Sequence, residues 1–210
     1  MKRPAWAIVP AKSLLQGKSR LRPVLDDGER ALFAQRLLEH VLDVLASCGL
    51  DGVLVATGGD DVAALASARG AHVLRDAGAG SLADVVDRAL AEVASRGAAT
   101  AVVLMADLPR IEPADVAALL AALDDHDVAL VRDHLGRHTN ALALTPPTAI
   151  RTCFGREDSF AAHAAAVRAA GLRAAVVESD RIAFDVDVPA DHRELTTARP
   201  EGGTGTARRA

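Results

Sequence analysis

The chain has 210 residues, enough for one well-buried core, and its formal net charge of -4 argues against a broad surface for binding nucleic-acid backbones. Half of the residues are apolar but only 2% are aromatic, so the core must be built mainly from Ala, Val and Leu. No apolar stretch reaches the roughly 18 residues of a membrane span, and the first ten residues lack the layout of a secretion signal. We therefore expect a cytoplasmic protein that binds neither nucleic acid nor membranes.

Short runs rich in Val and Leu alternate along the chain with longer Ala- and Leu-rich stretches, which is the pattern of strands and crossover helices in an α/β fold. The runs expected to form strands are Ala5 to Val9, Val53 to Ala56, His72 to Leu74, Ala101 to Met105, Val128 to Val131, Ala141 to Leu144, Ala174 to Val177 and Ala183 to Val186. The clearest expected helices run from about Glu29 to Ser47, from Leu82 to Val93 and onward from Pro113.

These elements predict a mixed, mostly parallel sheet of seven or eight strands flanked by helices. We expect a single domain over residues 1–195. Residues 196–210 contain almost no large apolar side chains and cannot bury enough surface to offset the entropy of ordering them. That segment is predicted to be a disordered tail.

The loop after the first predicted strand carries three basic residues, Lys12, Lys18 and Arg20, among small residues. Cations and backbone N–H groups beside a strand end are a common arrangement for binding phosphate. The loop lacks the glycine pattern of a Walker motif, so it does not predict a P-loop. Because most Lys and Arg side chains are simply solvated, that alternative stays open, and Lys12 is the strongest candidate for a phosphate contact.

Three acidic residues are placed at or near the ends of predicted strands. Asp107 follows the apolar run that ends at Met105, while Asp185 and Asp187 alternate with apolar residues as strand residues do. Functional groups collect at the carboxyl ends of parallel strands, so we expect the three carboxylates to share a divalent cation such as magnesium. Each residue alone has an alternative role as a cap or turn former. Together with the basic loop, they favour phosphoryl or nucleotidyl transfer.

A polar segment precedes the predicted strand at Ala141. Thr139 and Asn140, with nearby backbone N–H groups, could hold a carboxylate or phosphate there. The alternative is that this segment is only a hairpin connection.

The stretch from Cys153 to His163 indicates a glycine turn entering a helix. Asp158 or Ser159 is the candidate N-cap, and the exposed N–H groups of that helix start would attract an anion. His163 follows Ser159 by four residues and lies on the same helical face, where a packed or solvent-facing histidine is the commoner outcome than a ligand. No nucleophile pattern of the Ser-His-Asp or Cys-His kind is present, so we expect no covalent intermediate.

As a set, these motifs resemble the nucleotidyltransferases that join GMP to a phosphorylated three-carbon acid in biosynthesis of the deazaflavin coenzyme F(420), the CofC/FbiD-like family. The resembling segments are Val9-Pro-Ala-Lys with Lys18-Ser-Arg-Leu, Met105-Ala-Asp-Leu-Pro, Gly136-Arg-His-Thr-Asn-Ala-Leu, Phe154-Gly with Asp158-Ser159 and His163, and Phe184-Asp-Val-Asp-Val-Pro-Ala-Asp. Their order and spacing carry the resemblance, which runs from residue 5 to about 195.

The resemblance implies a GT-A-like (Rossmann-like) nucleotidyltransferase fold that uses GTP and magnesium, releases pyrophosphate and passes its product to a downstream transferase of the pathway. It also implies residue roles. Those roles are catalysis for Lys12, Lys18 and Asp107, metal binding for Asp107, Asp185 and Asp187, nucleotide binding for Pro10, Ala11, Lys12, Arg20 and Leu82, and binding of the acid for Thr139, Asn140, Gly155 and Ser159.

Acceptors in this family are 2-phospho-L-lactate, phosphoenolpyruvate and 3-phospho-D-glycerate. The segment from Gly155 to Ser159 is one residue longer than the common spacing, and we therefore lean toward 3-phospho-D-glycerate, whose charged ends lie farthest apart. Two other functions stay open. One is a cytidylyl- or sugar-nucleotide transferase of the same fold, and the other is a catalytically silent nucleotide-binding module.

Overall fold

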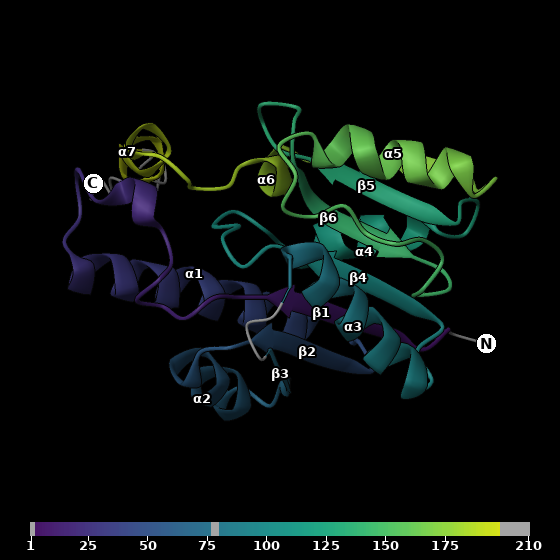
Figure 1. Ribbon diagram of the computed structural model, residues 1–210, viewed down its shortest axis with the longest axis horizontal. Coiled ribbons are helices and arrows are strands. Elements are labelled where there is room, and N and C mark those ends of the chain that lie inside the picture. Colours follow the sequence, from purple (N-terminus) through teal and green to yellow (C-terminus); the bar gives the residue numbers. More distant parts are fainter. Residues whose placement is uncertain (1–2, 77–79, 198–210) are drawn as a thin grey trace, which may run out of the picture.

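A seven-stranded sheet runs through the molecule in the order β3-β2-β1-β4-β6-β5-β7 (Figure 1). The computed structural model describes residues 3–76 and 80–197. Its strands are β1 Ala5–Pro10, β2 Gly52–Thr57, β3 His72–Arg75, β4 Thr100–Leu104, β5 Val128–Arg132, β6 Thr139–Leu144 and β7 Ala174–Val176. Only the pairs that involve β6 are antiparallel, so the sheet is mixed and mostly parallel, as predicted.

Helices connect and cover these strands. They are α1 Asp27–Ser47, α2 Asp60–Ala68, α3 Leu82–Ser95, α4 Pro113–Ala122, α5 Ser159–Ala169, α6 Asp180–Ala183 and α7 Pro189–Thr197, together with the 3-10 helix η1 Ser19–Leu21. The predicted helix starts are close to the observed ones because local capping defines them. Asp26 and Glu29 form a capping box at α1, and Pro113 occupies the first turn of α4.

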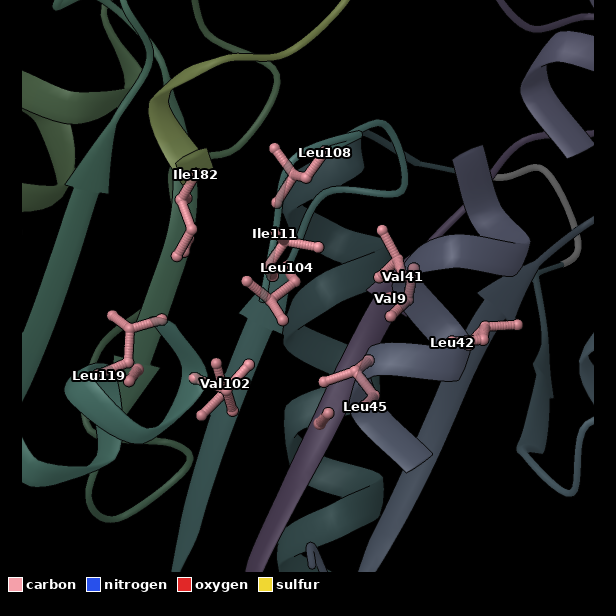
Figure 2. Close-up of a cluster of buried hydrophobic side chains, with 14 of the residues drawn as sticks. Val9, Val41, Leu42, Leu45, Val102, Leu104, Leu108, Ile111, Leu119 and Ile182 are labelled. Carbon is pink, nitrogen blue, oxygen red and sulfur yellow. The ribbon is translucent and has the colours of Figure 1, made fainter. Parts of the chain in front are cut away.

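The core lies on both faces of the sheet because the side chains of each strand alternate. In β1, Ala7 and Val9 face the layer of α1, α2 and α4, whereas Trp6 and Ile8 face the layer of α3 and α5. Figure 2 shows the first cluster, in which Val9 lies near the side chains that α1 contributes. Small Ala and medium Val and Leu side chains fill both layers, in line with the scarcity of aromatic residues.

The predicted strand at Ala183 to Val186 is wrong. Residues 180–183 form the short helix α6, and the following residues run extended without joining the sheet. Phe184 and Val186 are nevertheless buried, because they pack with Leu21 in a separate small cluster. The alternation of apolar and acidic residues therefore comes from an extended segment that packs on η1 and α1. It does not come from a strand of the sheet.

The connection between β5 and β6 is a hairpin loop, the alternative that the sequence left open for this segment. Asp133 is buried there and accepts hydrogen bonds from the backbone N–H groups of Arg137 and His138, at 2.6 and 3.0 Å. Gly136 has φ of 71°, which a residue with a side chain rarely adopts. At the other end of the chain, Thr196 and Thr197 close α7, and the rest of the predicted tail lies outside the described residues.

Candidate active site

Three carboxylates meet at the edge of the sheet where β1 and β4 end. Asp107 follows β4, and Asp185 and Asp187 lie on the extended segment after α6. One oxygen of each carboxylate lies within 4.8 Å of the others. The structure thus brings the three predicted metal ligands together, although two of them reach the edge from a loop.

Asp185 is the most buried member of this carboxylate cluster, with a side chain 13% exposed. Asn140 Nδ2 donates to its Oδ1 at 3.2 Å and to the carbonyl of Ile182 at 2.9 Å, which fixes both the carboxylate and the end of α6. Burial, followed by the nearby charges of Asp107 and Asp187, raises the pKa of Asp185 to about 6. The cluster is therefore short of positive charge, which a bound cation would supply.

Contacts behind α6 hold the segment that carries Asp185 and Asp187. Asp115 of α4 is 4% exposed and accepts two hydrogen bonds from the Arg181 guanidinium, at 2.8 and 3.0 Å, and one from Ser179 at 2.8 Å. The Arg110 guanidinium lies 3.5 Å from the centre of the Phe184 ring. These bonds anchor α6 to the rest of the fold, so the acidic segment keeps its place without strand pairing.

Lys18 supplies the positive charge nearest to the cluster. Its ammonium lies 2.5 Å from Asp107 Oδ2 and 3.1 Å from Asp187 Oδ1, and its side chain is only 9% exposed. Burial alone would lower the pKa of Lys18, but the charges and hydrogen bonds of Asp107 and Asp187 outweigh it and raise that pKa. Arg20 lies 3.5 Å from Asp187 and is 69% exposed. Lys18 therefore stays charged and neutralises part of the cluster.

Arg30 of α1 holds the backbone next to Lys18 through a hydrogen bond. Arg30 is 2% exposed, and its guanidinium donates to the carbonyl of Gly17 at 2.9 Å and pairs with Asp27. Lys18 itself has φ of 52°, a left-handed conformation that is uncommon outside glycine. The bond from Arg30 fixes the peptide just before this residue, and with it the direction in which the Lys18 side chain leaves the loop.

The other predicted nucleotide-binding residues do not contact the carboxylates. Lys12 is exposed and makes no hydrogen bond or ion pair with the residues that the structure describes. Pro10 ends β1, and the backbone N–H of Ala11 donates to Ala56 of β2 at 3.0 Å. Leu82 begins α3. Of the three predicted cations, the structure places Lys18 and Arg20 against the acids and leaves Lys12 free to meet a ligand.

The predicted acid-binding residues form a buried network. Thr139 and Ser159 are each 2% exposed, and the backbone N–H of Thr139 donates to Ser159 Oγ at 3.0 Å. Thr139 Oγ1 lies 2.9 Å from His163 Nδ1, and the backbone N–H of Cys153 donates to His163 Nε2 at 2.7 Å. Asn140 belongs to the carboxylate cluster instead. His163 is thus a packed residue, as the sequence favoured, but one bonded to two predicted site segments.

The start of α5 is less open to an anion than predicted. Asp158 is the N-cap but makes no capping bond with its side chain, which pairs with Arg156. The backbone N–H of Ser159 donates to Arg156 at 3.3 Å, and that of Phe160 to Arg137 at 3.1 Å. Because two N–H groups already have protein acceptors, an anion at this helix start would depend on the side-chain hydroxyls more than on the helix itself.

Gly155, a predicted acid-binding residue, lies against Leu82, a predicted nucleotide-binding residue. It has φ of 86°, and a Cβ placed on it would lie 3.3 Å from the Leu82 Cβ. The two segments therefore touch, and only glycine satisfies both the backbone angle and the close approach. Beside the carboxylate cluster, His134 lies 3.5 Å from Asp185 and also lines a cavity of about 550 Å³ between the β5–β6 hairpin and α6.

This arrangement has the donor set of a hard-cation site that also binds phosphate. Carboxylate oxygens are the ligands that hard divalent cations prefer, and three of them can meet at one point. Two cations of the basic loop, Lys18 and Arg20, border the same point. Such a site can neutralise charge on phosphate oxygens, and it contains no serine or cysteine nucleophile paired with a base among the described residues.

Three supporting residues escaped the sequence analysis. The sequence pattern indicates ordinary surface charges in helices for Arg30, Asp115 and Arg181. Arg30 and Asp115 are nevertheless almost completely buried. The one available signal was position, because Asp115 comes three residues after Glu112, at the place of a capping-box acid. Nothing in the pattern distinguishes Arg30 from the other arginines of the chain.

Solved structures with the same architecture define the class of protein. A protein from Desulfovibrio desulfuricans G20, provisionally described as a nucleotide-diphospho-sugar transferase, superposes with a TM-score of 0.80 at 18% identity, covering 96% of this chain and 90% of that one. A manganese complex of a protein from Mycobacterium tuberculosis H37Rv gives 0.57 at 22% identity, with coverage of 93% and 99%. The fold is thus that of GT-A-like nucleotidyltransferases.

Sequence comparison narrows the class to one family. Residues 5–204 match the family described as "Guanylyl transferase CofC like", and this chain belongs to it. The phosphoenolpyruvate guanylyltransferase of Sphaerobacter thermophilus is 39% identical over 94% of this chain and 95% of the relative. That of Rubrobacter xylanophilus is 42% identical, covering 90% and 92%. The 3-phospho-D-glycerate guanylyltransferase of Phenylobacterium zucineum is 35% identical, covering 97% and 94%.

Within residues 3–76 and 80–197, no helix combines the length and the apolar character needed to cross a bilayer.

Proposed function

We propose that the protein transfers GMP from GTP to the phosphate of a phosphorylated three-carbon acid, releases pyrophosphate and uses magnesium at Asp107, Asp185 and Asp187. The observation that carries the proposal is the meeting of three carboxylates with Lys18 at one edge of the sheet. Nucleotidyl transfer needs that combination, because phosphate oxygens must be neutralised on both sides of the reacting phosphorus. The names of the similar guanylyltransferases support the same reaction.

The reaction requires no nucleophile from the protein. An oxygen of the acid's phosphate attacks the α-phosphorus of GTP, a new phosphorus–oxygen bond forms, and the bond to the β-phosphate oxygen breaks. A phosphate monoester is largely dianionic near pH 7, since its second pKa is about 6, so no general base has to remove a proton. Magnesium, when bound, supplies charge neutralisation and orientation of phosphate oxygens.

The side chains of the basic loop then have separable tasks. Lys18 lies next to the carboxylates and stabilises charge that develops on the transferred phosphate. Lys12 and Arg20 are exposed and lie on the approach to that point, where they attract the outer phosphates of GTP. Pro10, Ala11 and Leu82 shape the floor of the nucleotide site.

The acid is held at its two ends. Its phosphate lies at the carboxylate cluster, and its carboxylate meets the hydroxyls of Thr139 and Ser159 beside Gly155. Thr139 and Asn140 are consecutive residues of β6, and Asn140 holds Asp185, so the two ends of the acid are linked through one peptide of the protein. The guanylylated acid, a mixed diphosphate, is a substrate for a downstream cytoplasmic transferase.

Among the possible acceptors we favour 3-phospho-D-glycerate, because of the extra residue between Gly155 and Ser159. Two relatives at 39% and 42% identity carry the name of phosphoenolpyruvate instead, which makes that acid the principal competitor.

The test is pyrophosphate release by the purified protein with GTP and magnesium, in parallel with 3-phospho-D-glycerate, phosphoenolpyruvate, 2-phospho-L-lactate and no acceptor. CTP and ATP replace GTP in matched reactions. We expect release that depends on GTP and on one acid, with 3-phospho-D-glycerate the best. Equal or faster release with phosphoenolpyruvate would reverse the acceptor choice, and no release with any acid would refute the proposed reaction.

A further inference from the structure

The side chain of His163 has no role in the mechanism described above, yet both of its ring nitrogens are bonded. His163 is fully buried on α5, and its ring packs edge-on against Phe154, with ring centres 4.7 Å apart. Its Nε2 lies 2.7 Å from the backbone nitrogen of Cys153, and its Nδ1 lies 2.9 Å from Thr139 Oγ1. These contacts fix the orientation of the ring, so its donor and acceptor positions can be assigned.

The partners of His163 determine its protonation. A backbone N–H can only donate, so Nε2 must offer a lone pair to Cys153. The proton of the neutral ring is therefore on Nδ1, which faces Thr139 Oγ1 and the backbone carbonyl of Ser159. The charged ring would place two N–H donors head to head at Cys153. Burial also lowers the pKa of His163 to about 4, so the neutral form prevails at neutral pH.

This assignment leaves two hydroxyl protons without an acceptor. Thr139 Oγ1 accepts from His163, and Ser159 Oγ accepts from the backbone N–H of Thr139. Within the described part of the chain, neither hydroxyl has a second hydrogen-bond partner. Both residues are 2% exposed, and a buried donor left unpaired costs about 1–3 kcal/mol. A group that only accepts hydrogen bonds would relieve both.

We propose that His163 is a positioning residue, whose Nδ1–H makes the Thr139 hydroxyl a donor toward the carboxylate of the acid. The backbone N–H of Thr139 likewise donates to Ser159 Oγ, so the Ser159 hydroxyl is also left to donate its proton. A carboxylate accepts two such bonds and donates none, which is the complement of this pair. The inference rests on the proposed function, because it takes the carboxylate of the phosphorylated acid as the ligand.

The test measures initial rates of pyrophosphate release by the full chain, varying the acid at saturating GTP and then GTP at saturating acid. His163→Leu removes the donor while keeping an apolar side chain of similar size, and we expect KM for the acid to rise about tenfold with KM for GTP within about twofold. His163→Asn retains a side-chain N–H that can reach Thr139, so we expect it to recover most of the loss.

Val167→Ala is the matched control, because Val167 is fully buried on the same helix and does not bond to Thr139. It should lower thermal stability and leave KM for the acid unchanged. An unchanged KM for the acid in His163→Leu would overturn the inference, and so would equal losses in the Leu and Asn variants.

A second comparison covers the case in which His163→Leu fails to fold. If His163 acts through the Thr139 hydroxyl, then adding His163→Met, which lacks the N–H donor, to Thr139→Val should leave KM for the acid unchanged. A KM for the acid that rises in the double variant by the product of the two single-variant changes would overturn the inference. Wild-type protein that releases no pyrophosphate with any acid would instead refute the proposed function, and the carboxylate assignment with it.

Discussion

The carboxylate cluster and the buried hydroxyl network lie at the same edge of the sheet but are held in opposite ways. At the cluster, like charges face one another and are kept in place by Lys18 and by the anchoring of α6. In the network, neutral groups satisfy one another in a fixed direction, and His163 has no exposed surface. In the carboxylate cluster, a bound cation would relieve the repulsion between the acids. In the hydroxyl network, the side chains are already oriented without a ligand.

The largest expected effect comes from removing a charge at the cluster. Asp107→Asn keeps the shape of the side chain but loses a proposed metal ligand, so turnover should fall by on the order of 10²–10³-fold. Thermal stability should change little, because the ion pair with Lys18 is lost but one of three repelling charges is gone and Lys18 keeps its contact with Asp187. Steady-state pyrophosphate release and thermal melting measure the two quantities.

Asp125→Asn is the control for that variant, since Asp125 is an exposed carboxylate away from the cluster. Turnover of Asp107→Asn within twofold of this control would remove Asp107 from the reaction.

The network should lose stability in acid. The pKa of His163 is about 4 in the folded protein and 6.5 as its unfolded reference, so the unfolded chain binds the extra proton first as pH falls. Stability should therefore decline between about pH 6.5 and pH 4, by roughly 3 kcal/mol from this residue. Urea unfolding of wild type and His163→Asn across this range isolates the contribution as the difference between the two slopes. Parallel pH profiles would contradict the assignment.

The cluster should show the opposite sign. The pKa of Asp185 is about 6 in the folded protein against 3.8 for its ordinary value, so the folded protein binds the proton first, and stability from this residue is lost as pH rises through 6. Asp185→Asn should thus stabilise the protein above pH 6, by roughly 2 kcal/mol, with the gain fading toward pH 4. Urea unfolding at pH 7.5, with and without magnesium, measures it. If Asp185→Asn were less stable than wild type at pH 7.5, the proposed repulsion between Asp185 and the other two carboxylates would be refuted.

The smallest effect concerns cation binding in the absence of nucleotide. Lys18 pairs with two proposed metal ligands, so Lys18→Met should tighten binding of Mn²⁺ by roughly tenfold. Arg20→Met removes an equal charge that is 69% exposed and should change the affinity by less than about twofold. Electron paramagnetic resonance of free Mn²⁺ gives both values. Equal changes in the two variants would mean that Lys18 acts only as a distant charge.

The sheet could be predicted because apolar runs identify strands. The end of β4 also places Asp107 as expected, whereas Asp185 and Asp187 reach the same point from a loop, for a reason other than the converging strand ends on which the prediction rested. The segment from Phe184 to Asp187 shows the limit of that reasoning, since an extended stretch alternates in the same way whether it joins a sheet or packs on Leu21. Its position was predicted correctly, and its secondary structure was not.

The choice between Lys12 and Lys18 shows why contacts between distant segments escape the sequence. Lys12 lies two residues after the end of β1, and that position favoured it. Lys18 reaches the acids because Arg30, twelve residues further along the chain, holds the turn before it. The bonding of His163 to Thr139 likewise joins residues on different elements. No spacing within one segment encodes such pairings.

The single antiparallel strand has a consequence for how this protein can diverge. Thr139 and Asn140 are neighbours on β6 at the point where its pairing with β5 shifts register, and one side chain bonds to His163 while the other bonds to Asp185. Moving β6 by one residue would withdraw both side chains from their partners and dismantle both half-sites at once. The register of β6 is therefore fixed by two sites at once, and a change in the β5–β6 loop is compatible with both only where it leaves the pairing around Asn140 in place.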